Sequence, residues 1–79
     1  MAITLDQAKA LKRGDTLYHI THRNADGSSQ RWKVNGTVRT WVRQPGKVQI
    51  PIKYGLYSFG YLDNNDLYLV CLTAEEALA

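Results

Sequence analysis

The 79-residue sequence contains one cysteine, Cys71, two prolines and no long apolar run. A single cysteine excludes an internal disulfide, so the core must be stable without a covalent crosslink, as is typical of a reducing compartment. A membrane-spanning helix needs roughly 20 consecutive apolar residues, and no stretch approaches that length. We therefore expect one soluble, cytoplasmic domain over residues 1–79, with no membrane among its partners.

The sequence also lacks the residue patterns of catalysis. It contains no nucleophile elbow, no cysteine–histidine arrangement and no obvious pair of carboxylates, and its acids lie mostly in expected turns or terminal segments. We expect a protein that is not an enzyme and that needs no cofactor.

Metal-binding patterns are weak. His19 and His22 are three residues apart in an expected strand, which would send their side chains to opposite faces unless a bulge intervenes. The segment 63–66, DNND, lacks the third ligand of a calcium loop because Leu67 occupies that position. The sequence predicts a turn there and no metal site.

Local signals predict a short helix at each end of the chain, of which only the first can form without support. Thr4 and Gln7 have the spacing of a capping box, good helix formers follow, and Gly14 suits a left-handed cap, so we expect a helix over about 5–13. Thr73 and Glu76 form a second capping box, but the tail 73–79 is too short to be helical unless it docks.

Between these ends the signals are those of β-strands. Five runs, TLYHITHR, QRWKV, TVRTWVR, KVQIPIKY and LYLVCL, are separated by turn-forming residues. Such spacing predicts an antiparallel meander over about 16–72, in the form of a small SH3-like barrel or a strongly bent sheet of about five strands. Pro51 lacks a backbone donor, so its strand should lie at an edge there or present this position away from its neighbour.

The pair Asn35-Gly36 predicts a hairpin between the second and third runs. A plain two-residue loop would mix apolar and charged residues on both faces, whereas a bulge at Gly36 separates them. With the bulge, one face carries Trp32, Val38, Thr40 and Val42, beside Tyr18 and Ile20 of the first run. The other face carries Arg31, Lys33, Arg39, Trp41 and Arg43, while Leu17, His19 and Thr21 lie on the reverse of the first run.

The stretch 48–62, VQIPIKYGLYSFGYL, changes phase at Gly55. A straight strand would put Tyr57, Phe59 and Tyr61 on the same face as Lys53, whereas a kink at Gly55 would turn the three rings inward. The sequence leaves both alternatives open.

Cations around an aromatic ring are the residues that a single-strand binder needs, because cations neutralise phosphates and rings stack on unpaired bases. The net charge of +3 permits a polyanionic partner without requiring one. The alternative is a solvated sheet face with Trp41 packed beneath an arginine stem. The candidate binding residues are Arg31, Lys33, Arg39, Trp41, Arg43, Lys53, Tyr57 and Tyr61.

At LKRGDTLYHI, VNGTVRTW and PIKYGLYSFGYL the chain resembles small, uncharacterised proteins of bacteriophage and prophage genomes. A Gly-Asp before the first strand and a Gly-x-Val at the third also resemble SH3-like barrels of the KOW or Tudor kind. The resemblance implies the cytosol of a bacterial host and a partner that is nucleic acid, a peptide or another protein. It transfers no binding residue to this chain.

We therefore expect a non-enzymatic binding module. Its first expected partner is single-stranded nucleic acid, bound through the basic and aromatic face. The alternative is a protein-interaction module of phage origin whose basic rim selects an acidic protein surface. Self-association into a homo-oligomer, through an open sheet edge or the aromatic patch, is a third possibility.

Overall fold

A computed structural model describes residues 2–78. Eight of its elements are regular helices and strands and one is a 3-10 helix. In chain order they are α1 (Leu5–Lys9), β1 (Thr16–Arg23), β2 (Ser29–Val34), β3 (Arg39–Trp41), β4 (Gln44–Lys53), β5 (Phe59–Asp63), η1 (Leu67–Leu69), β6 (Val70–Cys71) and α2 (Ala74–Leu78).

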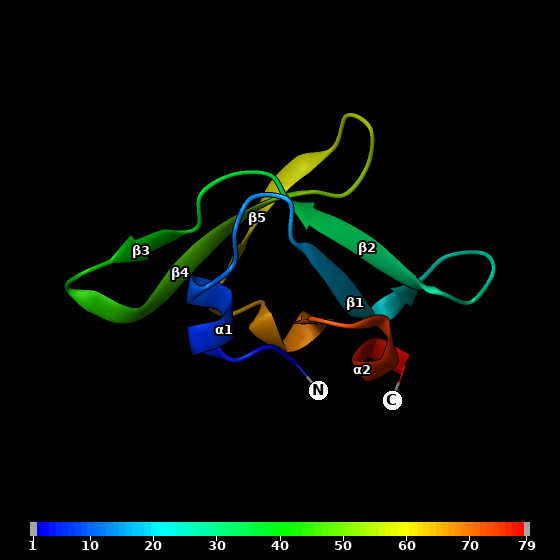
Figure 1. The fold of residues 1–79 in the computed structure, drawn as a ribbon, viewed down its shortest axis with the longest axis horizontal. Helices are drawn as coiled ribbons and strands as arrows, with labels where there is room; N and C mark the ends of the chain where they lie inside the picture. Colours follow the sequence, from blue (N-terminus) through cyan, green and yellow to red (C-terminus); the bar gives the residue numbers. More distant parts are fainter. Residues whose placement is uncertain (1, 79) are drawn as a thin grey trace.

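The strands of residues 2–78 form one antiparallel sheet around the long strand β4. β5 lies along one side of β4, while β3 and the end of β2 share the other side, followed by β1 and β6. Figure 1 shows the β3–β4 and β1–β2 hairpins pointing to opposite ends of the molecule, which measures 43 × 28 × 18 Å. The mainly β prediction is confirmed, but the sheet is open, because β5 and β6 do not pair to close a barrel.

The predicted Asn35-Gly36 hairpin is wrong. β2 pairs not with β3 but with β4, where Lys33 lies opposite Lys53, and β3 pairs further along β4, where Arg39 lies opposite Gln49. The peptide N–H of Asn35 donates to the carbonyl of Pro51 (3.1 Å), but Pro51 has no N–H to return the bond. The ladder therefore breaks at this point, and the chain re-pairs as β3 with its register shifted by two residues.

Pro51 accordingly lies in a central strand rather than at an edge, which is the second of the two positions its sequence allowed. Its ring packs against Gly36, where a Cβ atom would stand 3.2 Å from the proline Cγ. The glycine is thus explained by a close approach of two strands, and its φ is not in the left-handed region that the predicted bulge required.

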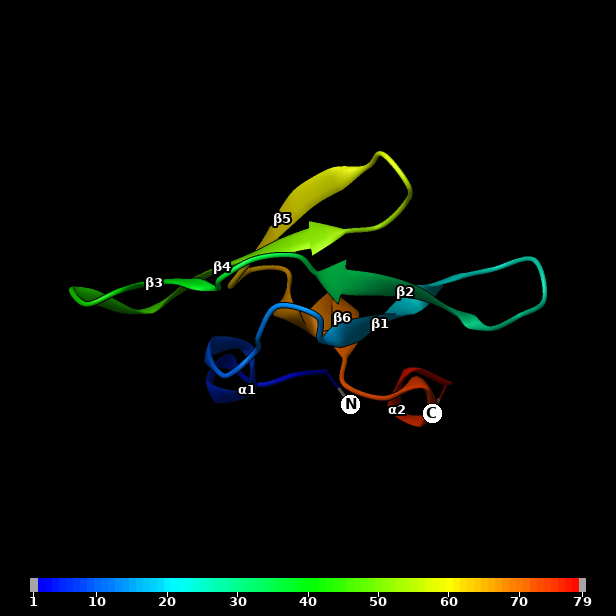
Figure 2. The same cartoon turned by 45° about the horizontal axis from the view of Figure 1, so that its top comes forward.

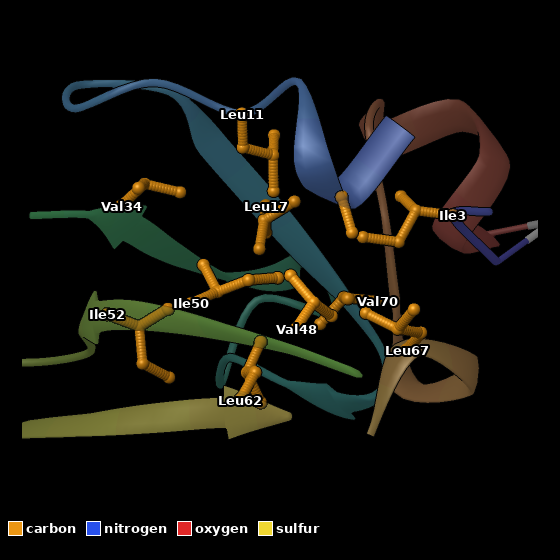
Figure 3. Packing of buried hydrophobic residues seen from close by; sticks show 11 residues of the cluster. Ile3, Leu11, Leu17, Val34, Val48, Ile50, Ile52, Leu62, Leu67 and Val70 are labelled. Atoms are coloured by element: carbon orange, nitrogen blue, oxygen red, sulfur yellow. The ribbon is translucent and has the colours of Figure 1, made fainter. Parts of the chain in front are cut away.

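The core lies on one side of the sheet, against α1 and η1. Figure 3 shows side chains of β1, β2, β4 and β5 meeting those of the N-terminal segment and η1, with Leu17, Val48 and Ile50 fully buried. Leu17 lies opposite Trp32, and the Trp32 ring contacts His19, with the ring centroids 4.7 Å apart. The predicted register of the first hairpin is therefore reversed, since Trp32 faces Leu17 and His19 rather than Tyr18 and Ile20.

In the third predicted strand, TVRTWVR, we expected Val42 to lie on the same side of the sheet as Trp32. Val42 instead lies in the turn between β3 and β4 and is 98% exposed, while Thr40 is exposed and Val38 packs against the core. Because β3 is only three residues long, the turn begins one residue after Trp41 and removes Val42 from the sheet.

Both terminal helices are short and depend on their caps and packing. α1 begins at the predicted capping box, with Gln7 N donating to Thr4 Oγ1 (3.1 Å), but it ends at Lys9. The reason is a turn in which Lys12 N donates to the Asp15 carboxylate (2.8 Å) and so leaves the helical ladder. In Figure 2, α1 lies below β3 and β4 and α2 lies near the β1–β2 end of the sheet.

The tail does dock, which is the condition for its helix. Arg23 Nη2 donates to the Ala77 carbonyl (2.9 Å), and Arg23 Nη1 donates to Ser29 Oγ (2.8 Å) and to the His19 carbonyl (3.2 Å). Ala77 is buried beneath this contact. One arginine of β1 therefore connects α2 to the start of β2.

The stretch around Gly55 neither runs straight nor kinks but reverses direction. β4 ends at Lys53 and β5 begins at Phe59, and Tyr54 N donates to the Ser58 carbonyl (3.1 Å) to close the loop. The Tyr54 ring covers Gly60, where a Cβ atom would stand 3.1 Å from Tyr54 Cε1. The three rings that follow Gly55 are exposed, and the strand register decides their face.

Candidate nucleic-acid interface

The sheet side away from the core carries most of the cations that the strands contribute. Residues directly opposite each other in an antiparallel ladder project to the same side, so the register identifies this side, here called the outer face. Lys53 lies opposite both Lys33 and Phe59, Pro51 lies opposite Tyr61, and Gln49 lies opposite Arg39 and Asp63. By the alternation of side chains along each strand, the outer face carries Arg31, Lys33, Arg39, Trp41, Lys47, Lys53, Phe59 and Tyr61.

The cations of the outer face form no close ion pairs with acids. Within residues 2–78, no salt bridge involves Arg31, Lys33, Arg39, Lys47 or Lys53, although Asp26 attracts Arg31 from a greater distance and Asp63 lies on the same side of the sheet at the end of β5. Asp63 is engaged with the following turn, where its Oδ1 accepts from Asn65 N (2.8 Å) and its N–H donates to Asp66 Oδ2 (3.1 Å). The outer face therefore has a positive potential available to an anion.

At the β3–β4 end of this face, two cations lie over the ring of Trp41. The Arg39 guanidinium carbon is 4.8 Å from the ring centroid and Lys47 Nζ is 4.4 Å from it. The Trp41 side chain is half-buried. The Trp41 ring thus holds two cations in place through cation–π contacts. Its face is less accessible to a stacking base than we expected from the sequence.

At the β4–β5 end, the rings are more open. Phe59 is 59% exposed and Tyr61 66% exposed, and Lys53 Nζ lies 5.8 Å from the Phe59 ring centroid. The loop beyond them exposes Leu56 (80%) and Tyr57 (92%) at its tip. This hairpin therefore exposes four large apolar side chains to solvent, and an exposed apolar patch of this kind usually marks a binding site.

The two ends are separated by the length of β4. From Lys47 to Lys53 the strand rises six residues, or about 20 Å at 3.3 Å per residue. Unpaired cations are present along this whole length, and flat rings are available at its β5 end. An extended anionic chain fits this distribution better than a compact anion does.

The structure brings together most of the predicted site residues but not all of them. Arg31, Lys33, Arg39, Trp41, Lys53 and Tyr61 share the outer face. Arg43 lies in the exposed turn between β3 and β4, and Tyr57 lies in the loop between β4 and β5, so neither has a fixed place on the sheet.

Two residues of this face were not among the predicted ones. Lys47 falls on the same parity as Lys53 in the fourth run, a signal that would have identified it. Phe59 has the parity of Tyr61, but its face could not be assigned until the hairpin at Gly55 was known.

The two histidines come together, because the strand irregularity stated above as the exception does occur. The register of β1 shifts between Tyr18 and Arg23, and this irregularity brings the His19 and His22 ring centroids to 4.1 Å. His19 Nδ1 accepts from Thr21 N (3.1 Å) and His22 N (2.9 Å), so this nitrogen is already used. Burial lowers the pKa of His19, and the charges of His22 and Arg23 lower it further.

In residues 2–78, no three metal-ligating side chains gather in one place. Neither α1 nor α2 is long or apolar enough to cross a membrane.

Comparison of the chain with protein-family models, curated proteins and solved structures finds no significant match.

Proposed function

We propose that the protein is a non-enzymatic module that binds single-stranded nucleic acid on its outer face. In this proposal, Lys33, Lys53, Arg39, Lys47 and Arg31 contact phosphates, while Phe59 and Tyr61 stack on unpaired bases. The observation that carries the proposal is the presence of these unpaired cations beside exposed rings on one side of one sheet. In keeping with the resemblance stated above, we place this activity in the cytosol of a bacterial host.

A single strand is favoured over a duplex by the chemistry of the rings. Stacking needs a base whose face is free, and bases in a duplex are already stacked on each other. The antiparallel hairpins β1–β2, β3–β4 and β4–β5 also support an open relative of the SH3-like barrels, a type of small β fold whose members include nucleic-acid binders, although β2 pairs with β4 rather than with β3.

The first test is a fluorescence titration of an oligothymidylate of about 12 nucleotides, within the usual range of single-strand site sizes. If about four phosphates are neutralised, affinity should fall roughly 50- to 150-fold when the salt concentration is raised fourfold. A duplex of the same length should compete weakly. Absence of binding at the lower salt concentration refutes the proposal.

A matched pair of variants separates this surface from net charge alone. Lys47→Ala with Lys53→Ala removes two cations of the outer face, whereas Lys12→Ala with Arg13→Ala removes two exposed cations next to α1. The first pair should lower the slope of log affinity against log salt by about 1.4, from 0.7 for each single-strand contact, and the second should leave it near the original value. Equal losses in both variants would mean that affinity follows net charge and not this face.

A second candidate function is a protein-interaction module, and one observation favours it. Leu56 and Tyr57 protrude at the tip of the β4–β5 loop, where an apolar anchor with a basic rim would suit an acidic protein surface. The resemblance to phage proteins makes a host protein the first partner to consider. Replacing Leu56 and Tyr57 with serine should abolish capture of such a partner and leave oligothymidylate binding within about twofold, since neither residue lies on the sheet.

A further inference from the structure

A pocket of about 240 Å³ lies between the β1–β2 hairpin and α2. Arg23 holds its two sides together, because its guanidinium bonds both Ser29 Oγ of β2 and the Ala77 carbonyl of α2. The pocket is lined by Tyr18, Ser28, Ser29, Arg31, Ala74 and Leu78.

The walls of this pocket combine apolar surface with unused polar groups. Leu78, Ala74 and the ring of Tyr18 supply the apolar part. Within residues 2–78, neither the Tyr18 hydroxyl nor the Arg31 guanidinium makes a hydrogen bond, whereas Ser29 Oγ accepts one from Arg23 and keeps its own hydrogen free to donate. A ligand with flat apolar faces and hydrogen-bonding edges matches these walls.

The pocket adjoins the outer face through β2. Arg31 and Lys33 are two residues apart on this strand and project to the same side, and Lys33 lies opposite Lys53. A step of two residues along β2 and one strand across gives about 8 Å between the Cα atoms of Arg31 and Lys53. If a phosphate of the strand contacts Lys33 and Lys53, the base of the same or the next nucleotide can therefore reach the pocket.

We infer that this pocket binds one unstacked nucleobase of the single strand that lies on the outer face, so the inference rests on the proposed function. The pocket is smaller than those that bury drug-sized ligands, which suits one base rather than a peptide. Proteins that read single strands hold splayed bases by stacking them on aromatic rings or arginine planes and by bonding their edges. The Tyr18 ring is placed to stack on the base, while the Tyr18 hydroxyl and Ser29 Oγ are placed to bond its edges and the Arg31 guanidinium to bond its phosphate.

The inference is tested on the ¹⁵N-labelled protein by NMR titration with AMP, CMP, GMP and UMP, each used alone. One base with one phosphate should bind with a dissociation constant on the order of 1 mM, because it makes few contacts. At least one of the four should shift the amides of Ser28, Ser29, Ala74 and Leu78. If none of the four shifts these amides at millimolar concentration, the inference is overturned.

Filling the pocket gives an independent readout. Ala74→Phe places a ring in the pocket wall, and Ala10→Phe adds the same ring at an exposed alanine at the end of α1. Ala74→Phe should abolish the monophosphate shifts and weaken oligothymidylate binding roughly 5- to 150-fold, the range for loss of one stacked base. Ala10→Phe should change neither. If Ala74→Phe does not fold, Arg31→Gln and Tyr18→Phe replace it, and each should weaken monophosphate binding at least about threefold, from loss of one hydrogen bond.

The failure of this inference differs from the failure of the proposed function. Oligothymidylate binding that depends on Lys47 and Lys53 but is unaffected by Ala74→Phe overturns the pocket and keeps the outer face. The opposite result is also informative. If the monophosphates shift the pocket amides but oligothymidylate shows no salt-dependent binding, the pocket is a mononucleotide site and the proposal that a single strand binds the outer face is refuted.

Discussion

Lys33 and Lys53 lie directly opposite each other on β2 and β4, on the outer face. Like charges placed opposite each other in a sheet destabilise it, so this pair lowers the stability of the fold. A surface with no function gains nothing from such a pair. A surface that binds phosphates gains two cations at one point, and this difference can be measured.

Replacing Lys33 with glutamate should raise stability and lower nucleic-acid affinity at the same time. Lys33→Glu turns repulsion across the ladder into attraction, so the free energy of unfolding in urea should rise by about 0.2 to 1 kcal/mol at low salt. The gain should shrink in 1 M salt, where charges are screened within about 3 Å. Lys33→Gln is the control, and it should gain roughly half as much.

The same variants report on function. Oligothymidylate affinity should fall in the order wild type, Lys33→Gln, Lys33→Glu, because the cation is first removed and then reversed. A gain in stability with unchanged affinity would place the bound strand elsewhere. An unchanged or reduced stability of Lys33→Glu at low salt would show that the two lysines do not interact.

Gly14 is expected to resist substitution because of its backbone conformation. Its φ of 97° lies in the left-handed region, and its N–H donates to the Val34 carbonyl (2.8 Å). Gly14→Ala should therefore lower the free energy of unfolding by about 1 to 2 kcal/mol, although no atom lies within 4 Å of the new Cβ. Gly46→Ala is the matched control, since that site is equally open and its φ is not positive, and its effect should stay within about 0.5 kcal/mol. Equal effects of both substitutions would contradict the assignment of strain to Gly14.

His19 should make the fold less stable in acid. Burial holds its folded pKa below the ordinary value of 6.5, so the unfolded chain binds the proton more readily than the folded one. The stabilising contribution is complete above pH 6.5 and is lost as the pH falls from there through the folded pKa. Protonation also places a hydrogen on Nδ1 and breaks the bonds it accepts from Thr21 N and His22 N.

Urea unfolding between pH 8 and pH 5 checks this expectation. In His19→Asn the amide oxygen can accept the same two backbone bonds but does not titrate, so the loss of stability on lowering the pH through this range should become smaller. The readout is the difference in stability between the two pH values, which is independent of any general cost of the substitution. A wild-type pH dependence retained in His19→Asn would assign the effect to another group.

The sequence predicted those parts of the fold that depend on neighbouring residues. The capping box of α1 formed as expected because Thr4 and Gln7 are three residues apart. The prediction of a hairpin at Asn35-Gly36 was wrong because it depends on Pro51, which is distant in sequence and contacts Gly36 only after β4 has paired. The residues of a turn carry no information about a missing backbone N–H, such as that of Pro51, on a strand elsewhere in the sequence.

The composition of the outer face was predictable despite the wrong pairing. The register of β4 with β2 differs from its register with β3 by two residues, which preserves the parity of side chains. Lys33 and Arg39 therefore share a side, as in the predicted hairpin, although they face different residues of β4. The pocket beside α2 was not predictable, because it depends on the contact between Arg23 and Ala77, which are 54 positions apart in the chain.

The aromatic residues on the outer face have two different surroundings, which imply two different roles. Trp41 carries Arg39 and Lys47 on its ring, whereas Phe59 and Tyr61 are open. If Trp41 positions cations, Trp41→Ala should weaken oligothymidylate binding and also lower its salt dependence, since Arg39 and Lys47 lose their support. The unfolding free energy should fall by about 1 to 2 kcal/mol, from the loss of two exposed cation–π contacts.

Tyr61→Ala should behave differently, because Tyr61 is assigned to stacking and, within residues 2–78, no cation lies over its ring. Its loss should weaken binding roughly 5- to 150-fold with an unchanged salt slope, since no phosphate contact is removed. Trp41→Phe is the conservative control and should keep most of the slope, because a smaller ring still attracts both cations. If Trp41→Ala instead lowers affinity at a constant slope, Trp41 stacks on a base in the complex, and one of the cations must leave its ring when the strand binds.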